Sequence, residues 1–252
     1  MLIDPTQLAF LAIVFGAYFV GTVLGFGTTI LVVTFGAQLV DLDVLLPIVS
    51  PLNIGLGGYI AIRHYRATRW RPLLRRWLPT VAVGVPLGLL LFNLRELTWL
   101  KLGFGVLVTI LAGLQLRATF GVRRGAAQPI AGSRGAALLF LGGIVHGVYA
   151  TGGPLVVYVM GREIDDKSAF RSTVSTLFLP LTVALIVDYV LLGLVTTEVV
   201  ELGLMSLGPV LAGLWLGEWA HRRINDRSFK LGVWLLLLAG GLVLTARSLL
   251  ES

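Results

Sequence analysis

Residues 146–155 read HGVYATGGPL, and the Ala-Thr-Gly-Gly-Pro step within them interrupts a chain built mostly of long apolar runs. A similar interruption, GFGTT at residues 25–29, lies 125 positions earlier. The apolar run after each break is too short to cross a membrane, which takes about 20 helical residues. Glycine at a break permits left-handed backbone and close approach of a ligand, and Pro154 suits the first turn of a helix. We therefore predict two half-length helices that begin inside a membrane.

The composition is that of a polytopic membrane protein. Of 252 residues, 56% are hydrophobic and 13% charged, and the mean hydropathy is +0.90. This is more apolar material than one water-soluble core encloses. Because the apolarity is continuous rather than alternating, helices are expected and a β-barrel is not. The predicted fold class is an all-α membrane protein surrounded by lipid.

Ten apolar segments are bounded by charged or turn residues. Two of them, those that follow the breaks, are of about half length. The segments cover residues 8–25, 28–40, 44–62, 77–92, 100–116, 135–150, 154–161, 169–194, 202–220 and 229–246.

Several classes of function are excluded or disfavoured. The chain has no cysteine, which removes disulfides, thiolate metal sites, iron–sulfur clusters and cysteine nucleophiles. It also lacks His-Glu-x-x-His, Gly-x-Ser-x-Gly and a central pair of aspartates. We therefore expect no catalytic residue, metal or cofactor, and no enzyme activity. The net charge of +7 lies in short connections rather than in one patch, so no nucleic-acid partner is expected.

The charged connections predict the topology. Residues 63–76 form the most basic connection and are placed in the cytoplasm by the positive-inside rule. When the apolar segments are counted in both directions from this connection, residues 117–134 and 222–230 are also cytoplasmic, whereas the acidic connections at 41–43 and 198–201 lie outside. If each short segment completes a crossing or hairpin with its neighbour, both termini lie on the non-cytoplasmic side.

The chain also matches itself. A shift of 125 positions pairs Gly27 with Gly152 and Ser50 with Ser175, and a shift of 129 pairs the Gly84/Gly88 step with Gly213/Gly217. Residues 1–116 and 135–252 then form two repeats of five segments, joined by a cytoplasmic linker at 117–134. An odd number of segments gives the repeats opposite orientations, which is typical of secondary transporters. The paired glycines themselves are explained most simply by close helix packing.

A helix that starts inside the membrane presents free N–H groups and the positive end of its dipole, which attract an anion. We expect the two starts to face each other near the midplane, with hydroxyls and amides of the following segments completing the site. The alternative is that the glycines serve tight turns or packing; their recurrence before each half-length segment favours the site. The predicted substrate-binding residues are Gly25, Gly27, Thr28, Thr29, Ser50, Asn53, Thr151, Gly152, Gly153, Ser172 and Ser175.

Ionisable residues within the apolar segments are few. His146 is a candidate proton carrier near neutral pH, or a packed neutral histidine. Arg171 is a candidate for drawing anions toward the pathway, or a charge that only sets topology. Asp188 and Glu218 lie toward segment ends, where snorkelling or a structural ion pair is the simpler interpretation.

The stretches GTVLGFG at 21–27, HGVYATGGPL at 146–155 and AFRST at 169–173, with the basic connection after the third segment, resemble the TauE/SafE family of sulfite exporters. The family is also called the toluene-sulfonate uptake permeases. The resemblance covers nearly the whole chain, and its most specific pieces lie in the second half.

The resemblance implies a secondary transporter of a small anion, commonly sulfite, a sulfonate or sulfoacetate, in a prokaryotic inner membrane. Protons are a candidate coupling ion because of His146. Its site residues would follow the two glycine motifs. Thr28 and Thr29 stand where the family pattern has further glycines, which leaves the identity of the anion open. An anion channel and a membrane scaffold or assembly protein are the alternatives, and the oligomeric state stays open.

Overall fold

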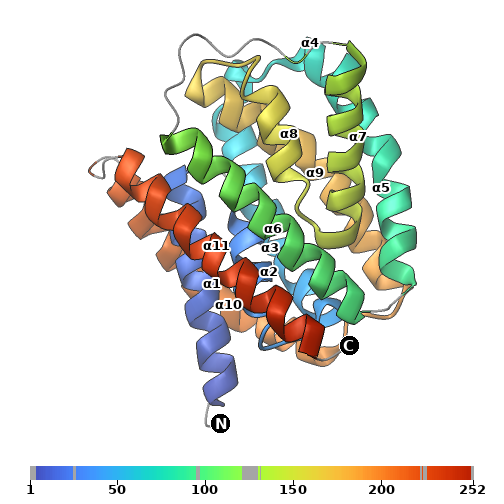
Figure 1. The fold of residues 1–252 in the computed structure, drawn as a ribbon, viewed down its shortest axis with the longest axis vertical. Coiled ribbons are helices and arrows are strands. Elements are labelled where there is room, and N and C mark those ends of the chain that lie inside the picture. Colours follow the sequence, from blue (N-terminus) through green and yellow to red (C-terminus); the bar gives the residue numbers. More distant parts are fainter. Residues whose placement is uncertain are drawn as a thin grey trace. The chain divides into compact units, whose positions relative to one another are not determined.

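The structure, a computed structural model, describes residues 4–24, 27–94, 97–120, 130, 132–221, 223 and 226–250. The regular elements in these ranges are all helical (Figure 1), which confirms the predicted fold class. They are α1 (Pro5–Leu24), α2 (Thr28–Gly36), α3 (Leu42–Arg63), η1 (Tyr65–Ala67), α4 (Trp70–Pro72), η2 (Leu73–Trp77), α5 (Leu78–Asn93), α6 (Leu97–Phe120), α7 (Gly132–Tyr149), α8 (Gly153–Met160), α9 (Lys167–Leu191), α10 (Thr197–His221) and α11 (Asp226–Leu250).

Seven helical stretches among the described residues are long and apolar enough to cross a membrane. α2 and α8 are much shorter, with 9 and 8 residues. At 1.5 Å per residue each extends for less than half of the roughly 30 Å hydrocarbon layer, so the two predicted half-length helices are confirmed. The seven stretches are Pro5–Val23, Leu42–Arg63, Trp70–Asn93, Trp99–Arg117, Ser168–Leu191, Thr197–Ala220 and Leu231–Leu250.

The order of helices repeats along the chain. α2 begins at Thr28 and α8 at Gly153, 125 positions later, and α6 begins at Leu97 and α11 at Asp226, 129 positions later. These are the two shifts at which the sequence matches itself. The opposite orientation of the repeats stays a prediction.

The helices group into two compact units that cut across the two repeats. The first unit takes Met1–Val49, Glu96–Arg124 and Val195–Ser252, and so contains α1, α2, the start of α3, α6, α10 and α11. The second unit takes Ser50–Arg95 and Gly125–Leu194, with the rest of α3, α4, α5, α7, α8 and α9. Each unit therefore combines helices from both halves of the sequence.

In the first unit α1 packs along α10, and α6 packs along α11. Glycines on α10 allow the first of these contacts. A Cβ atom added to Gly213 would lie 3.0 Å from the backbone nitrogen of Phe19, and one added to Gly217 would lie 2.7 Å from Cβ of Thr22. The predicted packing role of this glycine pair is confirmed.

In the second unit α5 packs along α7 in the same way. A Cβ atom on Gly84 would lie 2.9 Å from the backbone nitrogen of Ile144, and one on Gly88 would lie 2.7 Å from Cα of Gly147. The two backbones are in direct contact, as small residues permit. The same pairing thus occurs in both units, because the first helix of one repeat packs against the fourth helix of the other.

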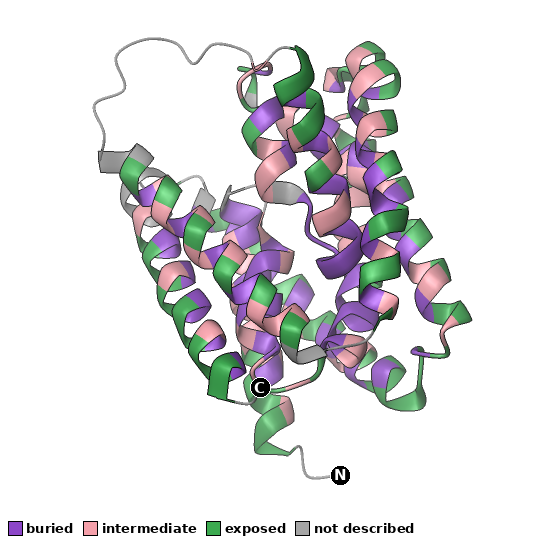
Figure 2. Ribbon diagram, turned by 45° about the vertical axis from the view of Figure 1, so that its right-hand side comes forward, coloured by how far each residue is buried: buried purple, intermediate pink, exposed green. Residues whose placement is uncertain are grey.

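Exposed residues occur along the helices (Figure 2), and many of them are large and apolar. Ile62, Leu191 and Trp215 are among the most exposed of them. Apolar exposure on this scale is unfavourable in water and marks a surface that meets a membrane.

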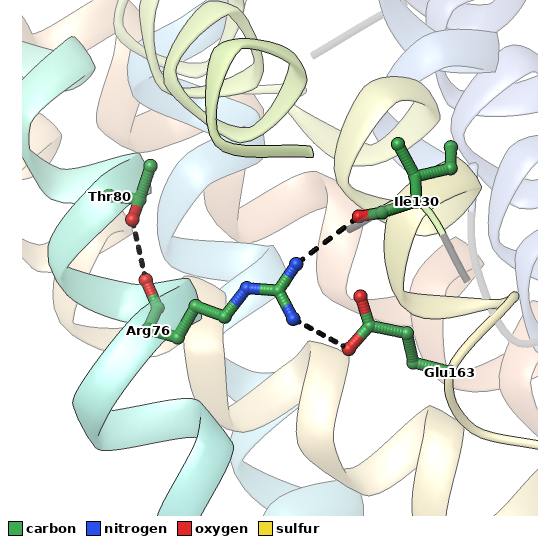
Figure 3. Close-up of polar contacts among 4 residues, drawn as sticks. All are labelled: Arg76, Thr80, Ile130 and Glu163. Carbon is green, nitrogen blue, oxygen red and sulfur yellow. Dashed lines mark hydrogen bonds and ion pairs between the residues drawn. The ribbon is translucent and has the colours of Figure 1, made fainter. Parts of the chain in front are cut away.

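An ion pair holds the connection after α8 in the second unit (Figure 3). Nη1 of Arg76, in the π-helical turn η2, donates to Oε2 of Glu163 at 3.0 Å, and Nη2 donates to the carbonyl oxygen of Ile130 at 3.3 Å. One guanidinium therefore joins three segments that are distant in sequence: the helix α4–η2–α5, the α8–α9 connection and Ile130, two positions before α7.

Candidate functional site

The start of α2, in the first unit, is an open glycine turn. Gly27 is the N-cap, with a left-handed φ of 90° and no side-chain cap on the helix. The first helical hydrogen bond runs from the Leu31 N–H to the Gly27 carbonyl at 3.1 Å. A Cβ atom on Gly27 would meet no described atom within 4 Å. The glycine is therefore required by its backbone angle, and the space beside it is open.

The two threonines that follow lie in different surroundings. Thr28 is buried, and its hydroxyl side chain occupies the position that a Cβ atom on Gly21 would take, so it packs the start of α2 against α1. Thr29 is half-buried. Gly25, the other predicted site residue of this turn, lies outside the described residues.

The start of α8, in the second unit, is held by a histidine. The N–H group of Gly152 donates to Nδ1 of His146 at 3.3 Å, and the Val156 N–H begins the helix by donating to the Gly152 carbonyl, also at 3.3 Å. Thr151 and Gly152 are buried. The predicted residues Thr151, Gly152 and Gly153 thus lie together with His146 at one helix end.

Gly152 serves a different purpose from Gly27. Its φ is −71°, which any residue adopts. A Cβ atom there would collide with the carbonyl oxygen of Gly142 and lie 2.9 Å from Cβ of His146. The packing interpretation therefore holds for Gly152, because the turn lies directly against α7. The left-handed residue in this half is Ala150, with φ 52°.

His146 is enclosed by protein. It is 2% exposed, and its ring lies 4.8 Å from the ring of Phe178 on α9, centroid to centroid. Because Nδ1 accepts a hydrogen bond, the neutral imidazole carries its proton on Nε2. Nε2 is buried and has no partner among the described residues. The side chain therefore presents one unused N–H donor near the start of α8.

The hydroxyls of Ser172, a predicted site residue, and of its neighbour Thr173 on α9 are bonded within the protein. The Ser172 hydroxyl bonds to the Thr68 hydroxyl at 2.6 Å and donates to the His64 carbonyl at 3.0 Å. Thr173 accepts the Arg69 N–H at 3.0 Å. The start of α9 therefore holds the connection between α3 and α4.

The remaining predicted residues lie on α3 and α9. Ser175 and Asn53 are half-buried. Ser50 is fully buried, and its hydroxyl has no partner among the described residues. Arg171 is half-buried, and its Nε atom is buried without a described partner.

Residues outside the predicted set also shape the start of α8. Phe178 and Gly142 surround His146 and Gly152, and Ala150 makes the left-handed turn. The shift of 125 positions places Ala150 opposite Gly25, and this glycine was the available signal for a left-handed residue. Nothing in the linear sequence indicated Phe178.

Long apolar helices together with two half-length helices that begin at glycine turns are typical of helical membrane transporters. Residues 9–244 match the family described as sulfite exporter TauE/SafE, and the chain belongs to this family. The chain is also 29% identical over 185 residues to the "Probable inner membrane transporter protein TsaS" of Comamonas testosteroni, an alignment that covers 72% of this chain and 74% of that protein. No solved structure gives a significant match. The predicted family is confirmed, and the protein is a membrane transporter of this family.

Proposed function

We propose that the protein is a secondary transporter that moves a small sulfur-containing anion, such as sulfite or a sulfonate, across a prokaryotic inner membrane. The family's description and the name of the related inner membrane transporter support this assignment. Transport proceeds by alternating access around a site near the membrane midplane, as is common in transporters with repeated halves and discontinuous helices.

The observation that carries the proposal is the unused Nε2–H donor of His146 beside the start of α8. A buried donor without an acceptor is rare in proteins, and an anion oxygen satisfies it. The positive end of the α8 dipole favours the same charge. A second helix start with an open glycine turn, that of α2, offers a similar environment.

In this proposal Thr151 and Gly153 bind the anion at the start of α8, and Gly152, whose N–H is bonded to His146, shapes the turn. Gly25, Gly27, Thr28 and Thr29 bind the anion at the start of α2. Each helix end contributes roughly 0.3–1 kcal/mol, and up to about 2 kcal/mol when partly buried. A donor that bonds a charged group adds about 1.5–3 kcal/mol. The total is modest, which suits a ligand that has to be released. Ser50, Asn53 and Ser175 are proposed to line the path, and Arg171 to attract the anion.

His146 is proposed to act as a neutral donor rather than to carry a proton. A protonated Nδ1 cannot accept the Gly152 N–H, so a proton would break the bond that holds the start of α8. The orientation follows from charge: the basic connection at 63–76 lies in the cytoplasm, both termini lie outside, and the two repeats are inverted.

A flux assay in proteoliposomes tests the proposal. The purified protein is expected to give saturable uptake of sulfite or an organosulfonate, with faster exchange when unlabelled anion is present inside, and no uptake of small carboxylates of similar size. A channel instead gives flux without exchange acceleration. A scaffold gives no flux at all, and either of these results overturns the proposal.

A further inference from the structure

A second polar cluster lies in the second unit and is separate from the start of α8. The Asn93 side chain, at the end of α5, hydrogen-bonds to the Asp188 carboxylate of α9. Tyr189, the next residue on α9, is paired in the same way with the Ser50 hydroxyl of α3. We call these four residues the oxygen cluster.

Aromatic packing joins the two pairs of the oxygen cluster. The ring of Tyr189 packs edge-on against the ring of Phe92, with 5.7 Å between the centroids. Phe92 precedes Asn93 on α5, just as Asp188 precedes Tyr189 on α9. Three helices therefore hold the four polar side chains at one level of the unit.

Beyond these two pairings, every member of the oxygen cluster has an oxygen atom that is buried and has no other hydrogen-bond partner among the described residues. These atoms are Ser50 Oγ, Asn93 Oδ1, Asp188 Oδ2 and the Tyr189 hydroxyl. Ser50 and Tyr189 are each 0% exposed, so bulk water does not hydrogen-bond to their hydroxyl groups. Buried polar atoms are nearly always satisfied, and four buried oxygens that can pair only with one another indicate a bound species.

The chemistry of the cluster selects a cation. All four of these atoms are oxygens, the ligands that hard cations take. The ion pairs among the described residues are Arg76–Glu163 and Lys101–Asp41, so Asp188 has no basic partner there, and the ion-pair alternative is not found for it. α5 and α9 end at Asn93 and Leu191, and the negative ends of their dipoles favour positive charge nearby.

We propose that the oxygen cluster binds a sodium ion, which is the coupling cation of the transporter. One carboxylate balances a single positive charge, and several oxygens suit a coordinated ion better than a proton, which needs only one acceptor. Helix C-terminal ends serve Na⁺ or H⁺ in other secondary transporters. Sodium binding rests on the cluster alone, whereas the coupling role also rests on the proposed function.

Thermal unfolding of the purified protein tests the binding step. At constant ionic strength, replacing choline chloride by NaCl is expected to raise the unfolding midpoint, and KCl is expected to do so much less. Asp188→Asn should remove the sodium effect, and Tyr189→Phe should raise the apparent sodium Kd about tenfold or more. Glu218→Gln, at an exposed acid of α10, is the matched control and should respond like the natural protein.

Several outcomes would overturn sodium binding: no response of the natural protein to NaCl, an equal response to KCl, or stabilisation by low pH alone, which indicates a proton site. If Asp188→Asn or Tyr189→Phe does not fold, the test uses Ser50→Ala instead, together with equilibrium binding of ²²Na⁺ to the natural protein. Failure of the natural protein to bind ²²Na⁺ would contradict the proposal.

Uptake assays in proteoliposomes with and without a sodium gradient then test coupling. Anion uptake that rises with the sodium gradient supports coupling. Anion uptake that is independent of the sodium gradient overturns coupling. Sodium binding without any anion uptake leaves the cation site in place and removes the proposed function, so the two failures are distinguishable.

Discussion

Nδ1 of His146 accepts the backbone N–H of Gly152 at 3.3 Å, and this contact fixes both the turn before α8 and the state of the imidazole. The acceptor atom carries no proton, so the ring is neutral and its other nitrogen, Nε2, is a donor. The ring is held further by Phe178. The contact therefore links the shape of the turn to the chemistry that it offers an anion.

His146→Leu should weaken anion binding, because the Nε2–H donor is lost. A hydrogen bond to a charged group is worth about 1.5–3 kcal/mol, and every 1.4 kcal/mol is tenfold in affinity. We expect a rise in the apparent KM for sulfite of about ten- to a hundredfold. His146→Gln, which keeps an N–H donor, should lose less. Equal transport by the leucine variant and the natural protein would show that this donor does not contact the substrate.

The pH dependence of transport tests the state of His146. With Nδ1 accepting a hydrogen bond, the imidazole stays neutral during transport, so His146→Gln should keep the shape of the natural pH profile between about pH 5 and 8, where an unperturbed histidine titrates. Rates are measured in proteoliposomes with equal pH on both sides. A profile that becomes flat in the glutamine variant would instead identify His146 as the proton carrier.

Ala150→Gly should stabilise the protein. Ala150 has a φ of 52°, a left-handed conformation that costs an L-residue about 1–2 kcal/mol. Glycine removes this strain but adds freedom to the unfolded chain, so the net gain is below about 1 kcal/mol. Thermal unfolding in detergent should show a slightly higher midpoint for Ala150→Gly and a lower one for Ala150→Val. A lower midpoint for the glycine variant would contradict the assigned backbone.

Gly88→Ala should destabilise the second unit. The added methyl group would lie 2.7 Å from Cα of Gly147 and force α5 and α7 apart. Overpacking of this kind costs about 1–3 kcal/mol or more. Gly113→Ala on α6 is the control, because a Cβ atom there meets no described atom within 4 Å. Matching unfolding midpoints for the two variants would show that the helices are not in backbone contact.

The Arg76–Glu163 pair should contribute little to stability. The side chains are 40% and 16% exposed, and such pairs typically give about 0.2–1 kcal/mol. A double-mutant cycle with Arg76→Gln and Glu163→Gln should therefore give a coupling energy below about 1 kcal/mol, measured by thermal or denaturant unfolding. A larger value would mean that the pair is more shielded from solvent than the structure indicates.

Much of the fold followed from the sequence because apolar runs and glycine breaks are local signals. The starts of α2 at Thr28 and α8 at Gly153 fall at the predicted breaks. The helical stretch that ends at Asn93 was predicted to begin near Trp77, but it begins at Trp70. Its arginines ended the apolar run without ending the helix, since long basic side chains extend from a helix toward water.

Contacts between distant segments could not be predicted in this way. Ser172 was expected to complete the anion site, but its hydroxyl bonds to Thr68 and His64, which lie more than 100 residues earlier. The grouping of helices from both halves into each unit is equally non-local. Periodicity shows which residues are apolar but not which helix they meet.

Selenite, a sulfite analogue with an anomalous scatterer, can locate an anion bound at the helix starts. In crystals of the protein grown with selenite, we predict a selenium peak beside Nε2 of His146 and the first N–H groups of α8, or beside Gly27 at the start of α2. The peak should disappear when sulfite is added in excess. Selenium bound elsewhere, or absent from both helix starts at saturating selenite, would show that the helix starts do not bind the anion.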